Sequence, residues 1–145
     1  MSDGVTVKIT AAPGITLPAY QTAGSSGADV RASVDTLIPA HGWAAVPTGL
    51  FCEIPPGWEL QVRSRSGLAL KEGIFVLNSP GTVDSDYRGE IKVILANLSD
   101  KEFTVKAGDR IAQLVLAKVE TAHFTAAETL SDTDRGAGGF GHTGK

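Results

Sequence analysis

Cysteine is almost absent from this sequence of 145 residues, since Cys52 is its only representative. One thiol cannot form a disulfide within the chain, which predicts a reducing compartment and a small, buried, apolar role for Cys52. Long apolar runs are also absent, whereas a membrane-spanning helix needs about 20 apolar residues in succession. The first residues have neither the basic start nor the apolar stretch of a secretory signal. We therefore expect a cytoplasmic protein that does not bind membranes.

Positive charge is scarce as well. Lys and Arg number 13 against 16 Asp and Glu, so the formal net charge is −3, and the basic residues form no cluster. Because nucleic-acid binding depends on basic surfaces, we expect no direct binding of DNA or RNA. Hydrophobic residues make up 42% of the chain, an ordinary share for a globular protein of one domain. Wholesale disorder is thus excluded.

Stretches free of glycine and proline are short, because 17 glycines and 7 prolines are spread along most of the chain. These residues interrupt regular structure, so long helices have little room. Between them apolar and polar residues alternate, which is typical of half-buried strands. Alternation is found in segments 5–9, 58–63, 91–95 and 103–106, and the apolar run 74–77 indicates a buried strand.

Turn signals separate the predicted strands, roughly every 8–12 residues, as in a sandwich, barrel or jelly roll. They are Ala12–Gly14, Pro39–Gly42, Pro47–Gly49, Pro55–Gly57, Ser79–Gly81 and Ala107–Asp109. The sequence predicts one short helix over Ser66–Lys71 and one further helical turn over Ala126–Leu130.

The segment 135–144 differs in composition from the rest, with five glycines in ten residues and one large apolar side chain, Phe140. Composition alone favours a disordered tail. The alternative is an arm that becomes ordered on a ligand. Its glycine amides and Arg135 can bind phosphate oxygens, and Phe140 can stack on a flat ring.

Two further segments carry groups suited to chemistry. Residues 84–90 hold three carboxylates and Tyr87 between two predicted strands, which fits either a solvated hairpin loop or a rigid loop carrying a general base. Residues 63–67 follow a strand and precede the helix, and fit either a helix cap or an anion site. The three histidines are far apart and have no cysteine or carboxylate at the spacing of a zinc site, so we expect none.

Five segments in a fixed order resemble the motifs of the homotrimeric dUTPases, which hydrolyse dUTP to dUMP and pyrophosphate. They are Ser26–Val30, Arg65–Ala69, Asn78–Gly89, Gly108–Leu114 and Arg135–Gly144, and they cover the chain from residue 26 onward. The third and fifth motifs are quite specific.

The resemblance implies an all-β, jelly-roll-like β-barrel over residues 1–134 and a flexible arm over residues 135–145 that closes over the active site. It also implies a homotrimer with three active sites at subunit interfaces. One subunit would provide the first, second and fourth motifs, the next the uracil-binding hairpin, and the third its arm. Such an enzyme keeps uracil out of DNA and supplies dUMP for dTMP synthesis.

The resemblance also implies a role for each matching residue. Asp84 would be the general base that activates a water for attack on the α-phosphorus, and Tyr87 would leave no room for a 2′-hydroxyl. Asp29 would hold the cofactor Mg²⁺ through water. The uracil contacts would be Asn78, Gly81, Thr82, Val83 and, beside this hairpin, Lys92; the phosphate contacts would be Arg65, Ser66, Gly67 and Gln113; the arm contacts would be Arg135, Phe140, Gly141, His142 and Thr143.

Two positions depart from the common pattern of the family. Ser64 stands where proline is usual, and His142 where serine is frequent. The loss of proline frees the backbone slightly, and His142 still offers a hydrogen-bond donor. Neither change touches Asp84 or Tyr87.

Three other functions compete with a dUTPase. A dCTP deaminase needs a glutamate at the water-activating position of the hairpin, where this chain has Asp84-Ser85-Asp86-Tyr87. A regulatory module that binds dUTP without turnover could lose Asp84 or the arm, and this chain keeps both. A purely structural β-sandwich with a tail would leave five ordered motifs unexplained.

Overall fold

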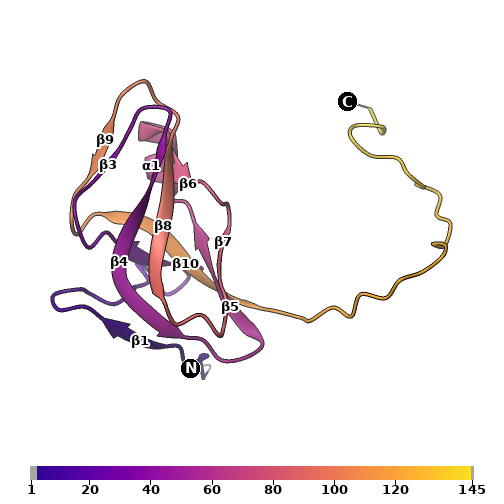
Figure 1. The fold of residues 1–145 in the computed structure, drawn as a ribbon, viewed down its shortest axis with the longest axis horizontal. Coiled ribbons are helices and arrows are strands. Elements are labelled where there is room, and N and C mark those ends of the chain that lie inside the picture. Colours follow the sequence, from indigo (N-terminus) through magenta and orange to yellow (C-terminus); the bar gives the residue numbers. More distant parts are fainter. Residues whose placement is uncertain (1–2, 145) are drawn as a thin grey trace.

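A computed structural model describes residues 3–144 of the chain. Within them it holds ten strands and one short helix (Figure 1). The elements are β1 (Lys8–Ala11), β2 (Ala28–Arg31), β3 (Thr36–Ile38), β4 (Trp43–Glu53), β5 (Trp58–Arg63), α1 (Ser66–Glu72), β6 (Ile74–Val76), β7 (Gly81–Val83), β8 (Glu90–Asn97), β9 (Phe103–Val105) and β10 (Arg110–Lys118). Residues 1, 2 and 145, which belong to the expected segments 1–134 and 135–145, lie outside the described part.

The strands form two four-stranded sheets, in the orders β1-β4-β8-β6 and β2-β10-β5-β7, and a two-stranded ribbon of β3 and β9. All paired strands are antiparallel. Both large sheets contribute to one apolar core, which includes Val46 and Val93 from the first sheet and Val62 and Leu114 from the second. The all-β, jelly-roll-like fold with one short helix is confirmed. In the described residues the two sheets remain separate ladders and do not close into a barrel.

The alternating segments became strands where their apolar positions could face this core. Segments 58–63 and 91–95 lie in β5 and β8, and segment 103–106 corresponds to β9 except for Lys106, which follows the last residue of the strand. The strand predicted over residues 5–9 begins later in the structure, because β1 starts at Lys8 and Val5 is exposed. The buried strand predicted over residues 74–77 is one residue shorter in the structure, because β6 ends at Val76 and Leu77 is exposed.

The predicted turn at Pro47–Gly49 is wrong, since these residues lie inside the long strand β4. Pro47 pairs with Lys92 and Leu50 with Ile91, so two residues of β4 are left between consecutive pairs, as in a β-bulge. Gly49 has φ +70°, a value that residues with a Cβ rarely adopt. The buried Thr48 hydroxyl donates to the Ile91 carbonyl at 2.5 Å and completes the hydrogen bonding of the bulge.

Helix α1 is one residue longer than predicted and buries none of its side chains fully. It ends at Glu72, and the next residue, Gly73, caps it: the Gly73 amide donates to the Ala69 carbonyl at 3.1 Å. The helical turn predicted over Ala126–Leu130 is wrong: no helix or strand follows β10 in the described residues. The same residues contain no helix long and apolar enough to cross a membrane.

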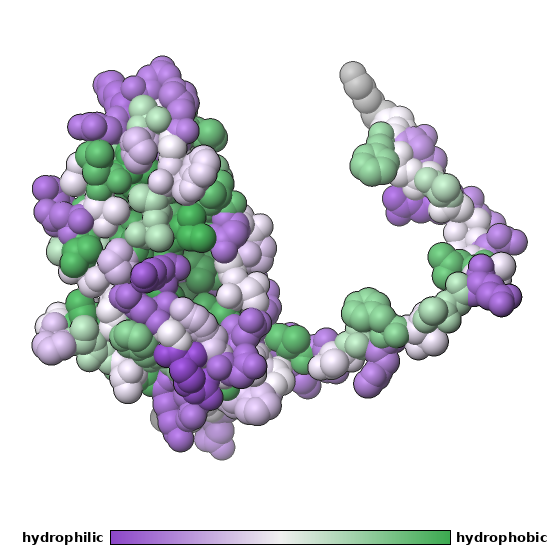
Figure 2. Space-filling view, viewed as in Figure 1, coloured by the Kyte–Doolittle hydropathy of each residue, from purple (hydrophilic) through white to green (hydrophobic). Residues whose placement is uncertain are grey.

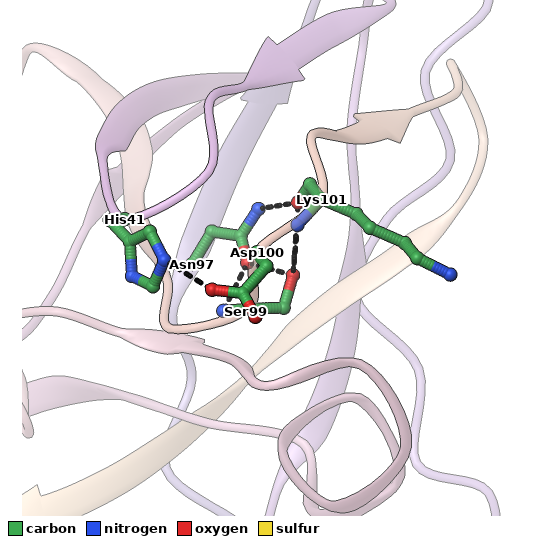
Figure 3. Close-up of polar contacts among 5 residues, drawn as sticks. All are labelled: His41, Asn97, Ser99, Asp100 and Lys101. Atoms are coloured by element: carbon green, nitrogen blue, oxygen red, sulfur yellow. Dashed lines mark hydrogen bonds and ion pairs between the residues drawn. The ribbon is translucent and has the colours of Figure 1, made fainter.

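A buried amide organises the loop between β8 and β9 (Figure 3). Asn97 donates to the carbonyls of Lys101, at 2.7 Å, and Ile38, and its oxygen accepts from the amide and hydroxyl of Ser99. Beside this network Nε2 of His41 lies 2.7 Å from Oδ1 of Asp100, which links the β3–β4 turn to the same loop. His41 therefore makes a surface contact between two loops.

Beyond β10 the chain leaves the sandwich and runs away from it (Figure 1). Its apolar and polar side chains stand apart from the body in the space-filling view (Figure 2). Phe124 is 97% exposed, Leu130 88%, and Phe140 is fully exposed. We call residues 119–144 the C-terminal segment and residues 8–118 the sandwich body.

Candidate active site

A cavity of about 330 Å³ opens beside β7 and β8, at the low end of the range for ligand pockets. Strands β4 and β5 supply the rest of its wall through Ala45 and Val62. Six of the residues expected to contact substrate line it together: Asn78, Gly81, Thr82, Val83, Tyr87 and Lys92. The structure therefore brings the expected uracil contacts of the sandwich body together with Tyr87 in one place.

The backbone of β7 comes unusually close to its neighbours at Gly81. A Cβ at this position would lie 3.0 Å from Cβ of Val62 on β5 and 3.4 Å from Nδ2 of Asn78. The missing side chain thus lets β7 pair with β5 while the exposed Asn78 amide stays beside it. A side chain at this position would require Val62, Asn78 or β7 to shift by a few tenths of an ångström.

The loop from Asp84 to Gly89 joins β7 to β8 through a tight turn. The Tyr87 amide donates to the Asp84 carbonyl at 3.1 Å, and the Tyr87 hydroxyl donates to the Glu90 carbonyl at 2.9 Å. The Tyr87 ring covers Gly89, where a Cβ would collide with it. Tyr87 thus lines the cavity in a fixed position, while the exposed Asp84 carboxylate lies outside the lining residues.

A second group of expected residues lies on the sheet β2-β10-β5. Its register places Asp29 opposite Gln113 and Gln113 opposite Arg63, two residues before Arg65. The Asp29 carboxylate is only 6% exposed and accepts from Nε2 of Gln113 at 3.4 Å and from Nη1 of Arg110 at 3.2 Å.

The neighbouring residues of the second motif meet the start of β10. The Arg65 guanidinium donates to the Arg110 carbonyl at 2.9 Å. Ser66 and Gly67 are exposed in the first turn of α1. Arg65, Gln113 and Asp29 are thus brought together around Arg110, apart from the cavity that Tyr87 lines.

The arm residues Arg135, Phe140, Gly141, His142 and Thr143 are not brought to either group. They form local turns, in which Nε of Arg135 donates to the Gly138 carbonyl at 2.7 Å and the His142 ring covers Gly138. Figure 1 shows this end of the chain well away from the sandwich body. One chain therefore presents its expected contacts in three separate places.

Comparison with known proteins identifies the family. A family model described as dUTPase matches residues 14–144. The chain belongs to the dUTPase family. The deoxyuridine 5'-triphosphate nucleotidohydrolase of Cytophaga hutchinsonii is 57% identical over 141 residues, which cover 96% of this chain and 92% of the relative. The protein of the same name from Chlamydia trachomatis serovar L2 is 59% identical over 136 residues, which cover 91% of this chain and 93% of the relative.

A solved structure extends the similarity to the fold of this dUTPase family member. A variant of Staphylococcus bacteriophage 80alpha dUTPase with dUpNHpp superposes with a TM-score of 0.88 at 21% identity. The match covers 97% of this chain and 99% of the phage chain, so the C-terminal segment is included.

The metal expected in a dUTPase has one candidate carboxylate here. The described residues contain no group of three His, Cys, Asp or Glu side chains that could hold an ion directly. Both Asp29 oxygens already accept a hydrogen bond, yet each carboxylate oxygen has a second lone pair. Mg²⁺ keeps several waters and binds through one or two carboxylates and substrate phosphates. Asp29 therefore fits an ion held through water, and fits direct ligation poorly.

A charged group outside the motifs, the Glu53 carboxylate, lies close to the hairpin through its ion pair with Arg88. A hydrogen bond from Lys8, and then the charges of Lys8 and Arg88, hold the pKa of Glu53 below its ordinary value. Burial raises the pKa of the Cys52 thiol, in agreement with its position in the core. Cys52 is thus the small buried residue that was expected.

Sequence reasoning missed Arg110 and Arg88, although both lie inside quoted motifs. Arg110 meets Asp29 across 81 positions of sequence, and Arg88 meets Glu53 on β4. Their position in the motifs was a usable signal. Their partners could not be named without the strand register.

Proposed function

We propose that the protein hydrolyses dUTP to dUMP and pyrophosphate. The observation that supports this most is the joining of Asp84 and Tyr87 in one hydrogen-bonded turn beside a cavity lined by Asn78 and Gly81. In a member of the dUTPase family, this arrangement offers a base-binding pocket next to a carboxylate.

The cavity is suited to uracil. The Asn78 amide offers both a donor and an acceptor, as does the edge of the uracil ring, and the backbone of Gly81–Val83 runs beside it. A tight hairpin excludes the methyl group of thymine by collision, which discriminates more strongly than a pocket that merely fits the smaller base. Tyr87, fixed by its bond to Glu90, would pack on deoxyribose and exclude a 2′-hydroxyl.

Asp84 would act as the general base. A carboxylate on a rigid loop can orient a water and accept its proton as the water attacks the α-phosphorus, with pyrophosphate as leaving group. The exposure of Asp84 leaves it accessible to that water.

The triphosphate would lie near the second group of residues. Arg65, Ser66, Gly67 and Gln113 would bind its oxygens, and Asp29 would hold Mg²⁺ through water. Bound Mg²⁺ would supply charge neutralisation for the polyanion. A net charge of −3 makes such local cations necessary.

The site would be completed by other copies of the chain. The expected contacts occupy three separate places in one chain, and Phe140 is fully exposed. A homotrimer in which residues 1–134 form the folded domain and residues 135–145 a flexible arm would unite them. Phe140 would stack on uracil, with Arg135, Gly141, His142 and Thr143 at the phosphates and Lys92 beside the base. Closure of the arm would exclude bulk water and align the α-phosphate.

The same proposal includes the setting of the reaction. Removal of dUTP keeps uracil out of DNA, and dUMP is the precursor for dTMP. Cytoplasmic location is supported by the single reduced and buried cysteine.

The test is pyrophosphate release in the presence of Mg²⁺ with dUTP, UTP, dTTP or dCTP, with EDTA as a control and ammonia measured in parallel. We expect fast release from dUTP alone, abolished by EDTA. Tight binding of dUTP without release would favour a regulatory module, and ammonia from dCTP would favour a deaminase.

A further inference from the structure

Arg88 connects the loop that carries Asp84 and Tyr87 to the rest of the sandwich body. Its Nη1 donates to the Ser85 carbonyl at 2.7 Å and, more weakly, to the Tyr87 carbonyl at 3.3 Å. Its Nη2 lies 3.5 Å from Oε1 of Glu53 at the end of β4. One guanidinium therefore contacts two carbonyls of the loop and a carboxylate outside it.

Glu53 is itself held in place from the other side. Nζ of Lys8, on β1, lies 3.1 Å from its second oxygen. The lowered pKa of Glu53, caused first by the hydrogen bond from Lys8 and then by the charges of Lys8 and Arg88, keeps this carboxylate ionised. The chain of contacts thus runs from β1 through β4 to the loop.

Global stability is a poor explanation for this arrangement. The side chains of Arg88 and Glu53 are 54% and 48% exposed, and exposed ion pairs contribute little to folding. Control of the loop geometry explains the arrangement better, because the planar guanidinium has five donors in a fixed fork and can bind several acceptors at once. The two carbonyls that it holds flank Asp86, within the turn that Tyr87 closes on Asp84.

We propose that Arg88 is a positioning residue, which sets the loop so that Asp84 faces the attacking water and Tyr87 faces the sugar, with Glu53 as its brace. This inference rests on the proposed function. A displacement of a reacting group by about 1 Å can lower a rate roughly 100-fold, so a loosened loop has a measurable effect. Selectivity between dUTP and UTP depends on Tyr87 in the same loop and changes with it.

The test compares Arg88→Gln, Arg88→Lys, Glu53→Gln and the control Lys8→Gln with the wild type. Lys8 touches the same carboxylate but no carbonyl of the loop. The readouts are kcat and KM with dUTP, the dUTP/UTP ratio of kcat/KM, and the midpoint of thermal unfolding. We expect Arg88→Gln to lower kcat by roughly 10–100-fold and to narrow the dUTP/UTP ratio, with a nearly unchanged midpoint. Arg88→Lys keeps the charge and should recover only part of the wild-type kcat. Glu53→Gln should lower kcat less than Arg88→Gln does, and Lys8→Gln should have the kcat of the wild type.

Unchanged kcat and selectivity in Arg88→Gln, or equal losses in Lys8→Gln, would overturn the inference while leaving dUTP hydrolysis intact. If Arg88→Gln does not fold, Arg88→Lys decides by the same readouts, since full activity with the charge alone would exclude a role for the fork. A wild-type protein without dUTP hydrolysis would overturn the proposed function and this inference together.

Discussion

The sandwich body and the C-terminal segment use their large apolar side chains in opposite ways. In the body, Val46, Val93 and Leu95 are buried in a core shared by two sheets. In the segment, Phe124 and Leu130 are almost fully exposed, and no strand or helix of the described residues lies beyond Lys118. A segment that buries so little in its own chain gains order only from a ligand or a partner. The body therefore has a core of its own, whereas we expect the conformation of the C-terminal segment to depend on a ligand or a partner.

This contrast suggests different functional roles for the sandwich body and the C-terminal segment. Under the proposed function the body would supply the groups that must be held rigidly, and Asp84 and Tyr87 do lie on a hydrogen-bonded loop between two strands. Under the proposed function the segment would supply contacts that form and break with substrate, among them Phe140 and Arg135. Changes in the body should therefore alter chemistry or folding, and changes in the segment should alter substrate capture.

The largest expected effect is that of Asp84→Asn. Loss of the general base should lower kcat by roughly 10²–10⁴-fold, because asparagine cannot accept the proton of the attacking water. The affinity for dUTP should remain, since the base pocket and the arm are untouched. Single-turnover kinetics and equilibrium binding of dUTP check both statements. Near-normal turnover would remove Asp84 from the mechanism.

The same chemical change in both regions should then have very different effects on folding. Leu95→Ala in β8 removes a buried side chain and should lower the free energy of unfolding by about 2–5 kcal/mol. Leu130→Ala should change it by less than about 0.5 kcal/mol, because Leu130 is 88% exposed. Urea denaturation of the two variants measures the difference. A comparable loss at Leu130 would contradict the contrast and show that an assembled partner buries it.

The two regions also differed in how well the sequence predicted them. Segments such as 58–63 and 91–95 were recognised as strands because alternation is a local signal, and the motif residues were recognised because they are contiguous. The bulge at Thr48 and Gly49 was taken for a turn, since Pro-Thr-Gly has the composition of one and only the register with β8 shows otherwise. The contact between Arg110 and Asp29 spans 81 positions, so it depends on strand pairing that no local pattern reveals.

The position of the arm could not be predicted for a different reason. Its composition permits both a disordered tail and a ligand-closing arm, because glycines restrict the backbone so little. The roles of Arg135 and Phe140 were assigned by resemblance to the family, and under the proposed function their substrate contacts would form only in a site shared with other copies of the chain.

Removal of the stacking side chain should have an intermediate effect. Phe140→Ala should lower kcat/KM for dUTP by roughly 5–150-fold, since stacking of an aromatic side chain on a base contributes about 1–3 kcal/mol. The midpoint of thermal unfolding should not move, because Phe140 contributes nothing to the core. A second variant that lacks residues 135–145 should still fold but should be nearly inactive. An unfolded product would mean that the arm is structural.

The smallest expected effect concerns a carboxylate on the surface of the body. The amide of Ala107 donates to Asp35 at 2.8 Å, and this bond, aided by Lys106, lowers the pKa of Asp35 from its ordinary value of 3.8. A lowered pKa in the folded state contributes stability that is fully present above the ordinary pKa and is lost as the pH falls through the folded value. Asp35→Asn should thus lower the unfolding midpoint slightly at pH 7 and not at all near pH 2, whereas Asp132→Asn in the exposed segment should be neutral at both. Thermal unfolding of the wild type and the two variants at both pH values tests this. If the midpoint of Asp35→Asn remained below that of the wild type near pH 2, the cause would be a disturbed turn and not the lost charge.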